Sequence, residues 1–413
     1  MYRSLMAGTV LSLSASACAG DPGARASSVG IDTVGTTIIV TNPERAAPSP
    51  SPLLARQAFL IGEEEGEPAY TFGSISSLAA DEAGRVYVSD VMADEVRVFG
   101  PGGEFIERIG RRGDGPGEFR APTGLAISNS GVLHVRDETR VQRFSPPRPG
   151  AAASRYEGSH PGPAYAFSLM TTRLDSAGRL YYPMRAGRIP NQKYFYLVYD
   201  SAGVLLDTLS LPASVRVPGE TAIFRTGASG GRMVPGLARS PFAPVPGWDV
   251  TAEGHLLISR GESYEIAELA GNGDTLRVIR REGAAAPVPP GEYDDSLRAV
   301  RQRVADAPAP VERLEGVAEE IRRGELPRTL PQILSVQAGT DGRIWVRRWP
   351  AAGEGGALYD ALSREGIYQY SVRLPLSMAS VPAPVFTDNR VYGVVVDSDT
   401  EVQRVVAYDL PAP

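Results

Sequence analysis

Residue types that carry out catalysis or bind metals are sparse in this sequence. The 413 residues include three histidines, which stand far apart at His134, His160 and His255, and a single cysteine. A zinc site takes two or three such ligands together, and neither a Gly-x-Ser-x-Gly elbow nor a His-Glu-x-x-His motif is present. The sequence therefore predicts no catalytic residue and no cofactor. It leaves open a divalent metal held in a central channel by carboxylate and amide side chains from distant parts of the chain.

The single cysteine, Cys18, lies where a lipid could be attached. Residues 5–17 are apolar or small, too few to span a bilayer, and end in Ala15-Ser16-Ala17 directly before the cysteine. This arrangement resembles a bacterial lipobox, which implies a signal peptide at 1–17 and acylation of Cys18. A plain secretory signal followed by an unrelated cysteine is the alternative. The Ala-, Gly-, Ser- and Pro-rich region that follows is interpreted as a lipidated linker over 18–54, with a lone strand candidate at 36–40.

Six charged residues occupy corresponding places at the ends of short predicted strands. We expect them to gather on one face of the fold, here called the upper face; they are Asp90, Asp137, Arg185, Arg260, Arg347 and Arg348. An arginine fork binds a carboxylate, sulfate or phosphate through two parallel hydrogen bonds. A small anionic ligand or an envelope protein is therefore the predicted partner. The alternative is that these arginines pair with the two aspartates or with neighbouring units as structural ties.

The elements that would position these residues recur along the chain. Each unit has a short strand, a tight turn and a second strand, as in Leu78–Val88 and Leu125–Val135. A polar residue opens the turn, and a residue expected at positive φ closes it. The closing residues are Gly84, Gly131, Gly178, Gly254, Gly342 and Asn389. Three of the intervals between them are 47 residues, and the other two are 76 and 88. A period near 47 with about four strands per unit is typical of propeller blades.

One stretch of the chain resembles a known repeat family. Gly115–Ala126 resembles the opening of an NHL repeat and Arg140–Phe144 its third strand. The chain as a whole is similar to bacterial exported six-bladed propeller proteins, which implies an all-β, six-bladed β-propeller over 55–413. The last unit lacks a fourth strand, and residues 57–61 match the outer strand of the unit after them. This N-terminal strand is therefore predicted to complete the sixth blade and close the ring.

Two insertions account for the two long intervals. They cover residues near 213–247 and 284–332, and both are expected on the upper face. The first is rich in Gly, Pro and Ser and is predicted to be an irregular loop. The second has apolar residues at helical spacing, so we expect a small helical hairpin between blades 4 and 5, ending at Gly324. Such a hairpin could cover the channel mouth as a lid or only shield one blade.

Composition narrows the function classes. The net charge of −6 gives no basis for binding nucleic acid, which needs clustered Lys and Arg. No segment after residue 17 is long and apolar enough to span a bilayer, so membrane attachment is expected through lipid alone. The sequence predicts an exported lipoprotein of a bacterial membrane, the outer one if present, acting as a binding or protein-interaction module. A metal-dependent propeller hydrolase of the lactonase type, or a lyase, is the alternative.

Overall fold

The turn that recurs through the chain is built by its own polar residue. The Asp81 carboxylate accepts hydrogen bonds from the backbone N–H groups of Ala83 and Arg85, both at 3.0 Å, and Gly84 adopts a φ of 76°. Positive φ costs glycine nothing sterically, so the chain reverses here without strain. In the computed structural model this turn joins the first two strands of an antiparallel sheet. The prediction for Gly84 is confirmed.

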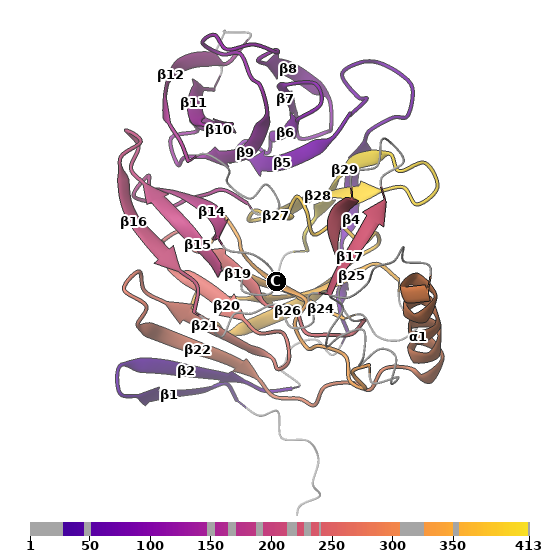
Figure 1. Cartoon of the computed structure of the whole chain (residues 1–413). Helices are drawn as coiled ribbons and strands as arrows, with labels where there is room; N and C mark the ends of the chain where they lie inside the picture. The colour runs from indigo at the N-terminus through magenta and orange to yellow at the C-terminus, as the bar shows by residue number, and fades with distance from the viewer. Residues whose placement is uncertain are drawn as a thin grey trace, which may run out of the picture.

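The structure describes residues 28–44, 51–146, 153–163, 171–186, 193–212, 221–226, 233–238, 241–305, 326–349 and 355–411. Over these ranges the fold is all-β with one helix, the predicted six-bladed β-propeller (Figure 1). Blade 1 contains β5 (Ile75–Ala80), β6 (Val86–Asp90), β7 (Glu95–Phe99) and β8 (Phe105–Ile109). Blade 2 contains β9 (Pro122–Ile127), β10 (Leu133–Asp137), β11 (Arg140–Ser145) and β12 (Arg155–Pro161). Blade 3 contains β13 (Arg173–Leu174), β14 (Leu180–Ala186), β15 (Lys193–Tyr199) and β16 (Leu205–Ser210).

The remaining blades follow the same order from the inside outward. Blade 4 contains β19 (Gly247–Val250), β20 (Leu256–Ser259), β21 (Glu265–Leu269) and β22 (Thr275–Arg281). Blade 5 contains β23 (Ser335–Ala338), β24 (Ile344–Arg348), β25 (Ala357–Leu362) and β26 (Tyr368–Leu374). Blade 6 contains β27 (Val385–Phe386), β28 (Arg390–Val396), β29 (Gln403–Asp409) and β4 (Arg56–Ile61).

The sixth blade closes the ring with the N-terminal strand, as predicted. Strand β4 pairs antiparallel with β29, with Ile61 opposite Val405 and Arg56 opposite Asp409. The first and last parts of the propeller therefore share one sheet. This pairing covers the edge that β29 would otherwise expose.

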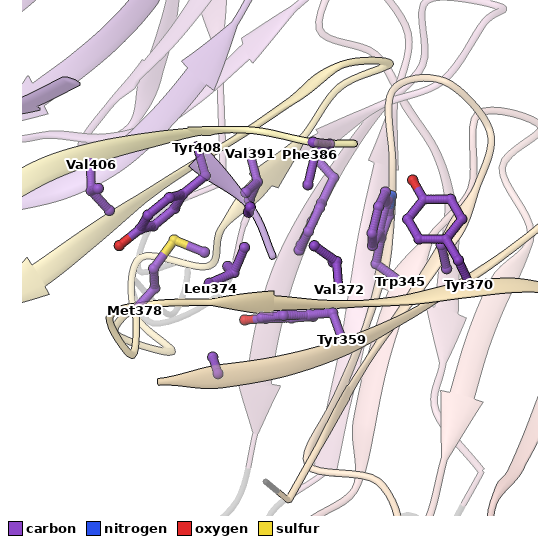
Figure 2. Packing of buried hydrophobic residues seen from close by; sticks show 14 of the residues in the cluster. Trp345, Tyr359, Tyr370, Val372, Leu374, Met378, Phe386, Val391, Val406 and Tyr408 are labelled. Atoms are coloured by element: carbon purple, nitrogen blue, oxygen red, sulfur yellow. The ribbon is translucent and has the colours of Figure 1, made fainter. Parts of the chain in front are cut away.

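Aromatic side chains fill the space between adjacent blades, and Figure 2 shows the cluster between blades 5 and 6. Trp345 of β24 stacks on Phe386 of β27, with ring centroids 4.4 Å apart and planes 14° apart. Tyr359 and Tyr370 meet the same pair edge-on. All four side chains are buried, so this contact removes a large apolar area from water and fixes the two blades against each other.

The region expected to be a linker over 18–54 contains strands in its second half. Strands β1 (Gly30–Val34) and β2 (Thr37–Asn42) form a hairpin, and β2 pairs parallel with β22 on the outer edge of blade 4 (Figure 1). Strand β3 (Leu53–Leu54) pairs parallel with β26 of blade 5. The β-branched run at 37–40 and an open blade edge favour this pairing. Residues 1–27, with the signal peptide and Cys18, lie outside the described residues.

Two other expectations differ from the structure. The first insertion contains the antiparallel hairpin β17 (Thr221–Thr226) and β18 (Met233–Ala238) where an irregular loop was expected, because its Gly-rich centre separates two short strand-forming runs. Asn389 does not adopt positive φ. In that turn the Thr387 N–H donates to the Arg390 carbonyl, and the Arg390 N–H donates to the Thr387 hydroxyl oxygen. These two hydrogen bonds make a tighter connection.

The second insertion contains α1 (Pro290–Ala305), between β22 and β23 and so between blades 4 and 5, as predicted. The expected second helix falls in 306–325, outside the described residues. Helix α1 lies outside the ring of sheets (Figure 1).

Candidate functional site

The structure places all six predicted site residues at or near the ends of second strands. Asp90 and Asp137 end β6 and β10, Arg185 lies one residue before the end of β14, Arg260 follows β20, and Arg347 and Arg348 end β24. These strands all begin at a turn with the inner strand, so their ends share the opposite, upper face. Position alone does not separate ligand-binding residues from structural ones, but the contacts of each side chain do.

Asp90 holds the connection into its own blade. Its carboxylate is fully buried and accepts backbone N–H bonds from Gly73 and Ser74 at 2.9 Å, while Arg97 donates to it at 3.2 Å. A buried carboxylate with this many donors is satisfied by the fold itself. Asp90 is therefore a structural tie.

Asp137 repeats that arrangement 47 residues later. The backbone N–H groups of Arg120 and Ala121 each donate to its Oδ1 at 2.8 Å, and Arg140 Nε donates to its Oδ2 at 3.0 Å. Asp137 is 1% exposed. It too is a structural tie, and its arginine partner is Arg140, which is not one of the four predicted arginines.

Arg348 shares a buried carboxylate that the sequence analysis did not single out. Asp360 Oδ2 accepts from Arg281 Nη1 at 2.5 Å and from Tyr264 Oη at 3.0 Å, and it lies 3.5 Å from Arg348 Nη1. Ser371 donates to the other oxygen at 2.6 Å. Asp360 itself is completely buried.

The charges of this group do not cancel. Two guanidinium groups face one carboxylate, which leaves an excess positive charge between blades 4 and 5. Arg281 is the inner of the two, lying over the Tyr368 ring at 4.1 Å. The Arg348 side chain is 36% exposed and borders solvent. Burial raises the pKa of Tyr264 well above its usual value, and the adjacent Asp360 adds to that rise, so its hydroxyl stays a donor.

The two other arginines of blades 4 and 5 are less constrained. Arg260 is exposed, and none of the described residues forms an ion pair or hydrogen bond with its side chain. Arg347 is half-buried, and its Nη1 donates to the Met378 carbonyl at 3.3 Å. Arg185 is exposed on blade 3, whose strand β14 packs on blade 4. Arg260, Arg347 and Arg348 are the predicted binding residues that the structure brings to neighbouring positions on blades 4 and 5.

The returning end of the second insertion connects these arginines. The N–H groups of Gln332 and Ile333 donate to the Gly261 carbonyl, and Leu334 N–H donates to the Arg347 carbonyl. Gln332 also accepts from Tyr264 N–H at 2.5 Å. One short segment thus fixes the backbone beside Arg260 and Arg347 in a single arrangement.

The two insertions pack on each other next to this segment. Phe242 of the first insertion contacts the Trp349 ring at 5.9 Å, and both belong to one apolar cluster with Tyr293 of α1. The cluster also contains Val288, Leu297, Leu326 and Leu330. The helix is thereby anchored beside the end of β24, where Arg347 and Arg348 lie. We call the surface formed by Arg260, Arg347 and Arg348 the arginine rim.

The sequence around Asp360 has a pattern that indicates a buried charge. It is the one charged residue within Ala357–Leu362, a strand whose residues are all buried. A lone charge in such a strand requires a partner. Its partner Arg281 lies on an outer strand 79 residues earlier, so the pair itself has no local pattern.

The three histidines do not form one group. His255 Nδ1 donates to Glu268 Oε1 at 2.8 Å on blade 4. His134 of β10 and His160 of β12 lie near each other on blade 2, and burial together with His160 lowers the pKa of His134. Within the described ranges, no group of three or more His, Cys, Asp or Glu side chains is placed to hold a metal ion.

Comparison with known proteins agrees with the architecture. A family model described as a six-bladed β-propeller matches residues 67–142. A candidate exported protein of Bacteroides fragilis is 11% identical, with a TM-score of 0.45 over 91% of this chain and 100% of its own. A virginiamycin B lyase of Staphylococcus aureus, as a catalytically inactive variant with quinupristin, is 13% identical, with a TM-score of 0.35 over 83% of this chain and 84% of its own.

These similarities carry no inference about activity, because the identities and TM-scores are too low. Comparison with curated proteins finds no match. In the described part of the chain, no helix is long and apolar enough to cross a membrane. The chain is a six-bladed β-propeller, and its fold alone does not choose between a binding module and an enzyme.

Proposed function

We propose that this chain is an exported lipoprotein, anchored through Cys18, whose NHL-like propeller is a binding module for a carboxylate-bearing ligand at the arginine rim. The anchor holds the propeller at a bacterial membrane, the outer one where the cell has two. The ligand is a small anion or an acidic segment of an envelope protein. Both present carboxylates to the same arginines.

The excess charge at Asp360 supports this proposal most directly. Arg281 alone would neutralise that carboxylate, and Arg348 adds a second guanidinium that is more than one third exposed. Arg260 adds a further cation, to which no described residue contributes a counterion. A carboxylate arriving from solvent would meet Arg348, which Asp360 already holds in place, and this reduces the cost of ordering that side chain on binding.

The binding test uses the purified full chain with citrate and with an acidic hexapeptide as probes. Arg260→Ala with Arg348→Ala should weaken binding measured by calorimetry by at least tenfold. Asp360 keeps Arg281, so melting should change little. Arg280→Ala is the matched control, because it removes a half-exposed arginine of the same region that is paired with Glu265. Equal affinities in the double variant and the control would overturn the assignment of the rim.

The anchoring test is independent of the ligand. Cys18→Ser should move the protein from the membrane fraction to the soluble exported fraction, since it removes the acylated side chain. Retention of the variant in the membrane pellet would contradict lipid anchoring. Metal analysis of the same preparation tests the hydrolase or lyase alternative, which needs a stoichiometric divalent ion.

A further inference from the structure

Buried arginines elsewhere in this propeller each face a carboxylate. Arg97 contacts Asp90 and Glu95 within blade 1. Arg173 contacts Asp249 at 2.5 Å between blades 3 and 4, and Arg281 contacts Asp360 between blades 4 and 5. The charges of Arg97, Arg173 and Arg281 are therefore each compensated by a carboxylate. Pairing is expected, because an uncompensated charge in a protein interior costs several kcal/mol.

The interface between blades 2 and 3 departs from this pattern. On β10, Leu133 and Val135 pack against blade 1, so the alternating residues His134 and Arg136 face blade 3. On the facing blade, Tyr182 packs with apolar residues of blade 2. Arg136 and Tyr182 therefore lie on opposing surfaces of the same interface.

Arg136 is buried there without a counterion. It is 6% exposed, its Nη1 donates to Thr123 Oγ1 at 3.0 Å, and its Nε has no hydrogen-bond partner. None of the described carboxylates lies within ion-pair distance of it. Burial lowers the pKa of Arg136, in contrast to the carboxylate-paired Arg173, whose pKa is raised.

Other buried polar groups on this side of blade 2 and on blade 3 also lack partners. The Tyr182 hydroxyl is buried and has no hydrogen-bond partner among the described residues. Burial raises the pKa of Tyr182 and the nearby Arg136 opposes part of that rise, so the two groups are close and the hydroxyl keeps its proton. The Nδ1 atom of buried His134 and the Nε atom of Arg143, on the same face of blade 2, are also unpartnered.

Gly124 lets Thr172 approach β9 closely beside Arg136. A methyl group at Gly124 would lie 2.5 Å from Thr172 Oγ1 and 3.3 Å from Arg136 Cβ. The Gly124 backbone has no positive φ, so glycine is not required there by conformation. Glycine instead makes room for Thr172, which brings the Thr172 hydroxyl next to the Arg136 side chain.

We infer that the interface of blades 2 and 3 contains a second site, in which Arg136 and the Tyr182 and Thr172 hydroxyls bind a small oxyanion. The ligand class is a single carboxylate, sulfate or phosphate group, small enough to enter between two blades. Such an anion supplies the charge that carboxylates supply at the other interfaces. The hydroxyls donate to its remaining oxygens. This site is separate from the arginine rim, which is on blades 4 and 5.

The test measures melting of the full chain in chloride buffer and with added sulfate, inorganic phosphate or acetate. The wild-type melting temperature should rise saturably with at least one of the three, because an anion bound only to the folded state stabilises it. Arg136→Met should remove that response. Gly124→Ala, which keeps the charge and displaces the Thr172 hydroxyl, should reduce it. Arg348→Ala should keep it, so failure at the rim and failure here are distinguishable.

A second measurement does not depend on the anion. In chloride, Arg136→Met should melt at or above the wild type, because it removes an uncompensated buried charge. Arg173→Met should melt lower, because it strands Asp249. The Arg136 Nε–H signal in NMR, assigned by its loss in Arg136→Met, should shift with the stabilising anion. The site would be overturned by an unchanged wild-type melting temperature with all three anions, or by an equal rise in Arg136→Met.

Discussion

Asp90 provides the sharpest test of which upper-face residues are structural. Its buried carboxylate receives backbone N–H groups from Gly73 and Ser74 and the Arg97 guanidinium. Asp90→Ala removes the acceptor of all three donors and leaves Arg97 with Glu95 and the Thr71 carbonyl. Breaking a buried pair in this way costs about 3–5 kcal/mol of unfolding free energy.

The expected change is large enough to measure by thermal melting. For a propeller of roughly 350 residues the unfolding entropy is about 0.7 kcal/mol per kelvin, so this loss lowers the melting temperature by about 4–7 °C. Asp90→Asn should lose less stability than Asp90→Ala, because its amide oxygen still accepts from Ser74. The loss should not be zero, because its NH₂ group faces the Gly73 and Arg97 donors. Asp137→Ala should match Asp90→Ala, since the same contacts recur 47 residues later.

Arg260→Ala is the control, because its exposed side chain has no partner among the described residues and should change stability by less than about 0.5 kcal/mol. Circular dichroism melts of the four variants decide the question. Equal melting of wild type, Asp90→Ala and Asp137→Ala would refute the assignment of the aspartates as ties.

Three further predictions follow from the fold. Deleting 53–62 should destabilise the whole propeller by opening the ring between β29 and β5, whereas deleting 19–34 should change melting little, because β1 is exposed along its length. Gly84→Ala should cost about 1–2 kcal/mol by forcing alanine into positive φ, and Asn389→Ala should be nearly neutral, by denaturant unfolding. Burial lowers the pKa of His134 to about 4, so between about pH 4 and 6.5 only the unfolded chain binds the proton. The free energy of unfolding should therefore rise with pH over this range, by up to about 1.4 kcal/mol per pH unit. His134→Gln should remove this part of the slope.

Local patterns predicted the blades well because each blade is built from neighbours in sequence. The second hairpin of blade 1 has the strands Glu95–Phe99 and Phe105–Ile109 on either side of a Pro-Gly-Gly turn. Turn chemistry and alternation fix such elements within about twenty residues. Closure by residues 57–61 was also predictable, since that segment repeats the spacing of the next outer strand.

The charged contacts were not predictable in the same way. Arg281 and Asp360 are 79 residues apart and meet only because blades 4 and 5 stack. The hairpin at Gly30–Asn42 pairs parallel with a strand more than 230 residues later, so no turn connects the two. Arg136 shows its lack of a partner only when both faces of the interface are known. Such contacts depend on which blades meet when the ring closes, and the sequence pattern within one blade does not specify them.

One position in the repeat accounts for both the ties and the rim. Asp90, Asp137, Arg260 and Arg348 each lie six residues after the turn glycine of their blade. In blades 1 and 2 the connection into the blade is short, and an acid there caps its backbone N–H groups. Before blade 5 the connection is a long insertion, fixed instead by Gln332 and by apolar packing. The position is then released from its structural task, and in blades 4 and 5 it carries arginine, the opposite charge. A position that changes from an acidic to a basic residue where its structural role disappears is well placed to bind a ligand.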